Sequence, residues 1–209
     1  MTRRWLATML LAFPAMAADL PLPDLRIEPT NGGSVFYIGN NTAQPLKAYL
    51  IELVDYPGSF YSFWQDETVA EPLPPKGERR IPVANMTVGA VPDYVKMRAA
   101  LYADGSTAGV PEKIAQLLDR RRTMLETVRQ VIMRMESAQD DMAKAGMPAN
   151  LKRWADTLLP QGKNRNTPAA MNQAAARGIV LGAAQRLDGQ SFAETLAFLR
   201  TWEKALQLH

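Results

Sequence analysis

The hydrophobic period of this chain changes close to Gly109, and that change limits the folds open to it. Before that point apolar and polar residues alternate over short stretches, whereas from Pro111 onward apolar residues recur at steps of three, four or seven. A period of two is typical of a half-buried strand, and a period near 3.6 is typical of a helix. The sequence therefore predicts an α+β protein, with a strand module over residues 19–110 and a helical module over residues 111–209.

The strand module holds several short stretches that are rich in β-branched and aromatic residues. They cover residues 34–40, 46–55, 59–66, 78–84 and 94–104, and turn-forming residues separate them. Pro82 confines its stretch to a sheet edge or a bulge. Five or six short strands with no helical period between them predict an antiparallel, immunoglobulin-like β-sandwich. The Pro-rich residues 19–33 are predicted to form an extended lead-in that ends in a turn.

Alternation within two of these stretches predicts which side chains share a face. In residues 46–55 the set expected to face the core is Tyr49, Ile51 and Leu53. In residues 94–104 one face carries Val95, Met97, Ala99 and Leu101, and the other carries Lys96 and Arg98.

The helical module opens with a long apolar stripe that continues as far as Met142. It predicts one helix over residues 111–145, ended by Gly146 and Pro148. Arg121 and Gln139 interrupt the narrow seam of apolar residues, so a bundle face is favoured over an intermolecular coiled coil.

Further helices are predicted over residues 149–159, over residues 168–187 behind a Thr167-Pro168 start, and after a capping box at Ser191 and Glu194. The prediction is thus a C-terminal bundle of three or four helices. Small residues repeat every four positions at Ala174, Gly178 and Gly182. Such a ridge lets another helix approach closely, most simply within the bundle.

Residues 1–18 read as a secretory signal peptide. Arg3 and Arg4 precede a short apolar run, and Ala15-Met16-Ala17 fits a small-x-small cleavage pattern, which predicts cutting after Ala17 or Ala18. The run is too short for a permanent membrane span, so no transmembrane anchor is expected after cleavage. The expected location is periplasmic or extracellular. An N-terminal anchor and twin-arginine export are the alternatives.

Several chemistries are disfavoured by the residues that the chain lacks. There is no cysteine, and the single histidine is the terminal His209, so no catalytic residue, metal site or cofactor is expected. Asp140-Asp141 and the arginines of residues 119–123 are interpreted as solvated helix faces. Residues 19–110 carry a net charge of −4 and residues 111–209 one of +5, and this near balance argues against a nucleic-acid partner.

The tripeptide Asp104-Gly105-Ser106 lies where the charge and the period both change. Asp-Gly is a common tight-turn pair, because glycine accepts a positive φ, so a turn is favoured over a calcium site. It is interpreted as the joint between the two modules.

The aromatic cluster of residues 56–64, "YPGSFYSFW", gives the best candidate contact site. In strand geometry its rings point to both faces, so some aromatic surface remains for a partner, unless it docks on the helical module. The predicted contact residues are Tyr61, Phe63, Trp64 and Asp66.

Residues 34–125, with "YIGNNTAQPLKAYLIEL", "PLPPKGERRIPV" and "ALYADGSTAGVPEKIAQLLDRRR", resemble a loose group of uncharacterised secreted bacterial proteins. These pair an immunoglobulin-like β module with a helical segment, and the resemblance implies export and a sandwich. The expected function is that of an exported, non-catalytic binding or structural protein, whose partner is an unknown protein or glycan of the cell envelope. The alternative is a carbohydrate-binding module, or a carboxylate-dependent glycan hydrolase, built around Trp64.

Overall fold

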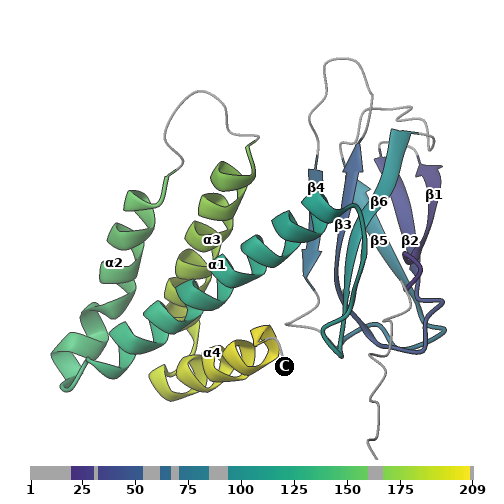
Figure 1. Ribbon diagram of the computed structural model, residues 1–209. Helices are drawn as coiled ribbons and strands as arrows, with labels where there is room; N and C mark the ends of the chain where they lie inside the picture. The colour runs from purple at the N-terminus through teal and green to yellow at the C-terminus, as the bar shows by residue number, and fades with distance from the viewer. Residues whose placement is uncertain are drawn as a thin grey trace, which may run out of the picture.

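The protein is an α+β molecule in which strands precede helices (Figure 1). The structure, a computed structural model, describes residues 20–30, 33–53, 62–66, 71–84, 94–159 and 167–207, so the predicted signal peptide lies outside the described residues. The strands within them are β1 (Asp24–Thr30), β2 (Gly33–Gly39), β3 (Leu46–Leu53), β4 (Ser62–Asp66), β5 (Glu78–Ala84), β6 (Val95–Tyr102) and β7 (Thr107–Gly109). The helices are α1 (Pro111–Glu136), α2 (Asp141–Thr157), α3 (Pro168–Gly189) and α4 (Phe192–Leu206).

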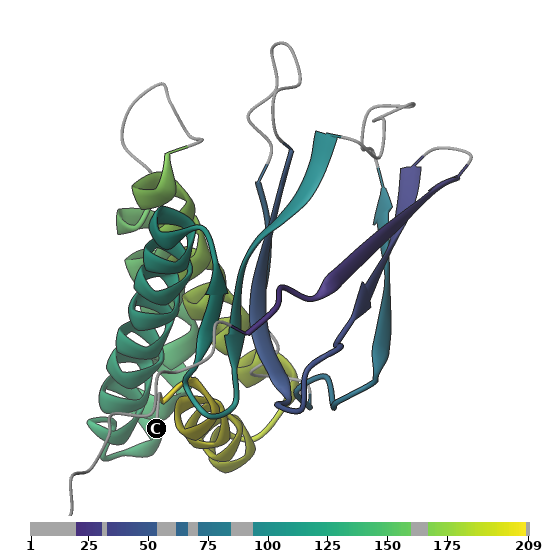
Figure 2. The same cartoon turned by 45° about the vertical axis from the view of Figure 1, so that its right-hand side comes forward.

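The described strands form two antiparallel sheets, with orders β1-β2-β5 and β4-β3-β6-β7, and the sheets face each other (Figure 2). Between them lies an apolar core that includes Phe36, Ile38, Tyr49 and Ile51. Pro82 lies in β5 at a sheet edge, which confirms the position expected for it. Strand β1 was not expected: part of the Pro-rich lead-in pairs with β2, and the strand is an edge that buries little.

A β-bulge in β6 changes which residues face the core. Leu50 pairs with Ala99, but the next residue of β3 pairs with Met97, so Arg98 is the extra residue. The face predicted for this strand is therefore split between two clusters. Val95 and Met97 lie with the inter-sheet core, whereas Ala99 lies on the outer face of the sheet.

Asp104-Gly105-Ser106 forms the predicted turn, but it is not the joint between the modules. Gly105 has a φ of 84°, and Ser106 donates its N–H and its hydroxyl to Asp104 Oδ1 at 3.0 and 2.5 Å. These hydrogen bonds lower the pKa of the Asp104 carboxyl. The chain then returns as β7, which pairs with β6, so the joint lies at Gly109 and Val110.

Gly109 is required at that joint. Its φ is 117°, and a Cβ there would lie 2.2 Å from the carbonyl oxygen of Arg98. The same carbonyl accepts a hydrogen bond from Val110 N at 2.9 Å, one residue before α1 begins. The backbone therefore passes from sheet to helix through a short, hydrogen-bonded connection.

The first turns of α1 pack on the outer face of the four-stranded sheet. Leu117 is buried against Leu50 and Leu101 there. Glu52 accepts a hydrogen bond from Lys113 Nζ at 2.5 Å and lies 3.5 Å from Arg98 Nε, which ties the sheet to the helix. Both faces of this sheet are thus covered, one by the other sheet and one by α1.

The long helix predicted over residues 111–145 is wrong. Helix α1 ends at Glu136, and Asp140 begins α2 by accepting a hydrogen bond from Ala143 N at 2.7 Å. Asp140 is therefore an N-cap. Met142, which seemed to prolong the apolar stripe, is 86 % exposed. Gly146 and Pro148, predicted to end the long helix, lie inside α2.

The four helices pack together around their own apolar core, to which α1, α2, α3 and α4 all contribute. The starts predicted for the last two helices are confirmed: Thr167 caps α3, and Ser191 and Glu194 form the capping box of α4. In the part of the chain that is described, no helix is both long and apolar enough to cross a bilayer.

Candidate functional site

The structure describes the predicted aromatic site only in part. Tyr61 lies outside the described residues, and β4 is an edge strand of its sheet. In the ladder Trp64 pairs with Leu50, Phe63 with Ile51 and Asp66 with Ala48. A contact of these residues with a ligand or partner remains a prediction.

A groove between α1, α3 and α4 is the better-defined candidate. Its volume is about 370 Å³. The lining residues are Arg120, Met124, Ala175, Gly178, Ile179, Gly182, Ala183, Arg186, Phe198, Leu199 and Trp202. A second hollow of about 440 Å³ shares Gly182 and Arg186 and continues the groove to Gln190. We call the two together the α3 groove.

The floor of the α3 groove is made of small residues at positions 175, 178 and 182 of one helix. A Cβ built on Gly178 or on Gly182 meets no atom within 4 Å. The ridge of small residues was predicted to lie against another helix of the bundle. Instead, at both glycines it faces open space.

One wall of the groove is aromatic. The rings of Phe198 and Trp202, one turn apart on α4, have centroids 5.9 Å apart and planes inclined at 50°. Met124 of α1 and Ile179 of α3 add apolar surface beside them. Rings and thioether side chains give a large apolar contact that adapts to its occupant.

Two arginines lie toward the ends of the groove. Arg120 Nη1 donates to the carbonyl oxygen of Met171 at 3.3 Å, near the start of α3. Arg186, in the last turn of α3, lies with its guanidinium carbon 3.6 Å from the centre of the Phe198 ring and donates to Gln190 at 3.3 Å. At 1.5 Å per residue, Met171 and Arg186 are about 22 Å apart along the helix. Among the described residues that line the groove, none is acidic.

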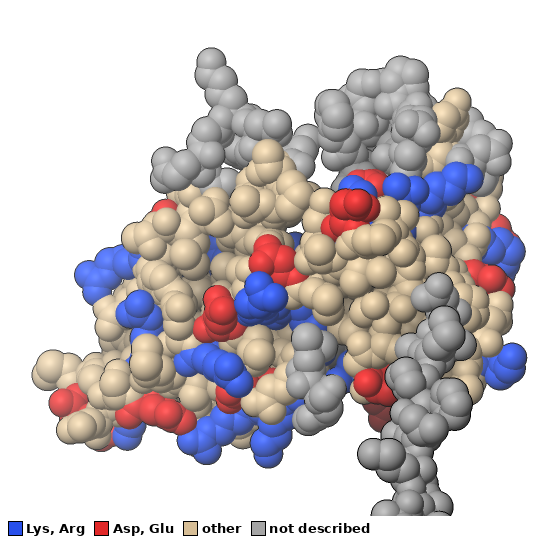
Figure 3. Space-filling model, viewed as in Figure 1, with Lys and Arg blue, Asp and Glu red and all other residues tan. Residues whose placement is uncertain are grey.

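The arginines of residues 119–123 do not all lie on a solvated face, as had been predicted. Arg120 lines the groove, Arg121 is only 1 % exposed, and Arg122 is exposed. The sequence signal for burial was present, because Arg121 continues the stripe of Leu117, Met124 and Val128 at helical spacing. On the face shown in Figure 3, acidic side chains lie among the basic ones of the helical module.

The groove is suited to binding by shape, apolar contact and positive charge. Among the described residues no three His, Cys, Asp or Glu side chains gather where they could hold a metal ion. A scan against protein-family models, a search of curated proteins and a search of solved structures each found no match to this chain.

Proposed function

We propose that this chain is an exported, non-catalytic binding protein that acts on another macromolecule of the cell envelope. The α3 groove holds a short helical segment of the partner, whose small, apolar face lies on α3 and whose acidic residues meet Arg120 and Arg186. The observation that carries this proposal is the open space above Gly178 and Gly182. The N-terminal signal pattern supports export.

Glycine inside a helix costs about 1 kcal/mol relative to alanine, because the unfolded chain has more freedom to lose. Gly178 and Gly182 both lie inside α3, and no described atom needs the space that a Cβ would take. A helix that approaches from outside does need that space, since small residues let two helix backbones come close. A helix of a partner that packs on α3 therefore accounts for glycine at both positions.

The dimensions and charge of the groove select the kind of occupant. The α3 residues that line the groove run from Ala175 to Gly189, about 21 Å along the helix at 1.5 Å per residue. That length accommodates roughly four helical turns, which is typical of helix-in-groove recognition. The aromatic wall supplies anchoring contacts, and the two arginines favour carboxylates near both ends of the bound segment. A basic or strongly polar helix fits neither feature.

The strand module is proposed to be an immunoglobulin-like sandwich that holds the helical module in place. Its two facing antiparallel sheets support this assignment, as do its short strands. Because the first turns of α1 pack on one sheet, the groove has a fixed orientation relative to the strand module.

The test is a binding titration with designed helical peptides, in which fluorescence anisotropy reports the bound fraction. One peptide carries alanines along one face and glutamates at both ends, and a matched peptide carries lysines in place of the glutamates. We expect the acidic peptide to bind, and Gly182→Leu, which fills the groove, to weaken that binding at least about ten-fold. Ala197→Leu, at an exposed position of α4 that does not line the groove, is the matched control.

Two results would overturn the proposal. One is equal affinity for the acidic and basic peptides, and the other is an affinity that Gly182→Leu leaves unchanged. Circular dichroism of both leucine variants shows whether they retain the helical content of the parent, so a lost affinity is not confused with unfolding.

A further inference from the structure

We propose that a second copy of this chain docks its helix α2 in the α3 groove, so that the protein associates head to tail. The docking surface is the α3 groove, so the proposal rests on the proposed function and names a competitor that the partner must displace. Three features of α2 carry it: an exposed apolar face, the spacing of that face, and the carboxylates at its ends.

Helix α2 has an exposed apolar face. Met142 is 86 % exposed, and Ala145 and Ala149 are exposed as well. Steps of three and four residues place these three side chains on one side of the helix, and we call them the α2 face. The buried Met147 and Leu151 point into the helical core instead. In Figure 1, α2 lies at the end of the helical module away from the sheets, so its outer side is open to another molecule.

The α2 face has the spacing that the floor of the groove requires. Ala145 and Ala149 are four residues apart, and so are Gly178 and Gly182. A Cβ built on either glycine meets no atom within 4 Å, so there is room for an alanine of another helix above each one. Alanine packed on glycine at both positions lets two helix backbones approach closely.

Carboxylates lie at both ends of the α2 face. Asp141 and Asp156 are about 22 Å apart along α2, which equals the separation of Met171 and Arg186 along α3. If α2 lies antiparallel to α3 with its alanines over the glycines, Asp141 comes beside Arg186. Asp156 then comes beside Met171, whose carbonyl oxygen accepts a hydrogen bond from Arg120 Nη1 at 3.3 Å. The antiparallel direction also opposes the two helix dipoles.

The ion pair expected between Asp141 and Arg186 is open on both sides. The Asp141 side chain is fully exposed and lies 3.8 Å from Lys144 of its own helix, a long contact that solvent screens. The Arg186 guanidinium lies on the Phe198 ring and donates to the neutral side chain of Gln190 at 3.3 Å, which leaves N–H donors for a carboxylate.

The basic residues of the same helix lie to the sides of the α2 face. Lys152 Nζ donates to Asp188 of its own chain at 2.9 Å, and Arg153 donates to the side chain of Asn150. The face itself therefore presents methyl groups and a thioether to the groove, as the apolar floor and the aromatic wall require.

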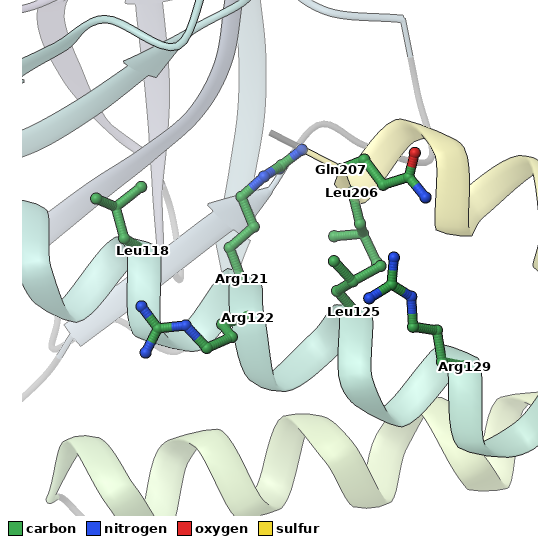
Figure 4. A pocket seen from close by; sticks show the side chains of 7 residues that line it. All are labelled: Leu118, Arg121, Arg122, Leu125, Arg129, Leu206 and Gln207. Atoms are coloured by element: carbon green, nitrogen blue, oxygen red, sulfur yellow. The ribbon is translucent and has the colours of Figure 1, made fainter. Parts of the chain in front are cut away.

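A second cavity in the helical module does not fit a helix. It has a volume of about 370 Å³ and lies between α1 and the end of α4 (Figure 4). The described residues that line it are leucines, arginines and a glutamine, so no helix backbone can approach closely there. Arg121 extends across it and donates from Nη2 to the carbonyl oxygen of Ala205 at 2.6 Å. The α3 groove, with its floor of small residues, is therefore the surface that suits α2.

The α2 face and the α3 groove are different surfaces, so the contact is heterologous. Each chain offers one of each, and association therefore continues into a ring or an open chain of copies. One helix in one groove makes a small interface, which gives weak and reversible association. A partner with a better-fitting helix can thus displace the second copy.

Sedimentation velocity of the full mature chain, residues 19–209, over a series of concentrations tests the proposal. We expect reversible self-association, which Ala149→Lys and Gly182→Leu each weaken at least about ten-fold, because one places a charge on the α2 face and the other fills the groove. Asn150→Lys, which adds the same charge at an exposed position beside the α2 face, is the matched control. Circular dichroism shows whether each variant keeps the helical content of the parent.

A mixture of the two variants gives the sharpest result. The Ala149→Lys chain keeps its groove, and the Gly182→Leu chain keeps its α2 face. An equimolar mixture is therefore expected to form a dimer with one chain of each kind and nothing larger. Asp141→Lys and Arg186→Glu are each expected to weaken association about three-fold, and the double variant to associate more tightly than either, because the pair is restored with its charges exchanged.

Four results would overturn the proposal: a monomer at every concentration, equal association of the Ala149→Lys and Asn150→Lys chains, a mixture that stays monomeric, or a double variant that regains nothing. The acidic peptide separates this outcome from the fate of the proposed function. A monomeric chain that binds the peptide leaves the proposed function intact. A self-associating chain that the peptide binds without dissociating shows that the second copy lies elsewhere.

Discussion

Glycines in this chain serve two opposite purposes, and the space around each one distinguishes them. Gly109 has a positive φ and a carbonyl oxygen in the place of its missing Cβ. Gly178 and Gly182 have ordinary helical backbones and empty surroundings. The first is therefore needed by the fold, while the other two reduce the stability of the helix that contains them.

Substitution by alanine is accordingly expected to have opposite effects at these positions. Gly178→Ala and Gly182→Ala each raise the free energy of unfolding by about 1 kcal/mol, because alanine favours the helix and its Cβ meets nothing. Gly109→Ala lowers that free energy by about 2 kcal/mol or more, because it combines a strained φ with a steric clash. Urea denaturation measures all three. A destabilising Gly182→Ala would show that the groove floor is already occupied.

Arg121 shows what the sequence alone does not disclose about a single residue. Its spacing placed it on the apolar stripe of α1, and it was interpreted as an interruption of the seam. What buries it is the end of α4, which lies 84 positions later in the chain and offers the carbonyl oxygen of Ala205. No local pattern contains that contact.

At the scale of elements, the apolar period predicted the α+β class and five of the seven described strands, all but β1 and β7, but it failed where two helices meet. Apolar residues recur in phase from α1 as far as Met142, so the break after Glu136 shows in the stripe only as one polar residue, Gln139. The informative signal was Asp140, three residues before Ala143, which is N-cap chemistry rather than a solvated carboxylate. The bulge at Arg98 was hidden in the same way, because alternation continues on either side of it.

The boundary between α1 and α2 can be tested at that cap. Asp140→Ala removes the acceptor for Ala143 N and is expected to lower the free energy of unfolding by about 1 kcal/mol. Asp140→Asn keeps an acceptor oxygen and should retain most of that stability, which separates capping from simple charge. Thermal denaturation, monitored by circular dichroism, compares the stability of the two variants with that of the parent. Equal stability of the alanine variant and the parent would contradict a helix start at Asp141.

For the whole molecule, the decisive feature is that one helix belongs to both halves. Helix α1 begins on the four-stranded sheet, at the Leu117 cluster, and ends in the helical core with Val131 and Met135 (Figure 1). The sequence predicted two modules but did not show that they pack together, because both faces of β3 are apolar and only the structure shows what covers the second. With α1 shared, the α3 groove keeps a fixed relation to the sheets.

This sharing predicts that the two modules unfold as one unit. Leu117→Ala removes apolar contacts between α1 and the sheet, and such a core truncation lowers the free energy of unfolding by about 2–5 kcal/mol. Hydrogen exchange followed by mass spectrometry should then show the same loss of protection in β3 and in α3, although only β3 is near the substitution. Met133→Ala, at a 62 % exposed position of the same helix, should leave both unchanged. If Leu117→Ala lowered protection in β3 alone, the strand and helical modules would be independent, and the orientation of the groove would not be set by the sheet.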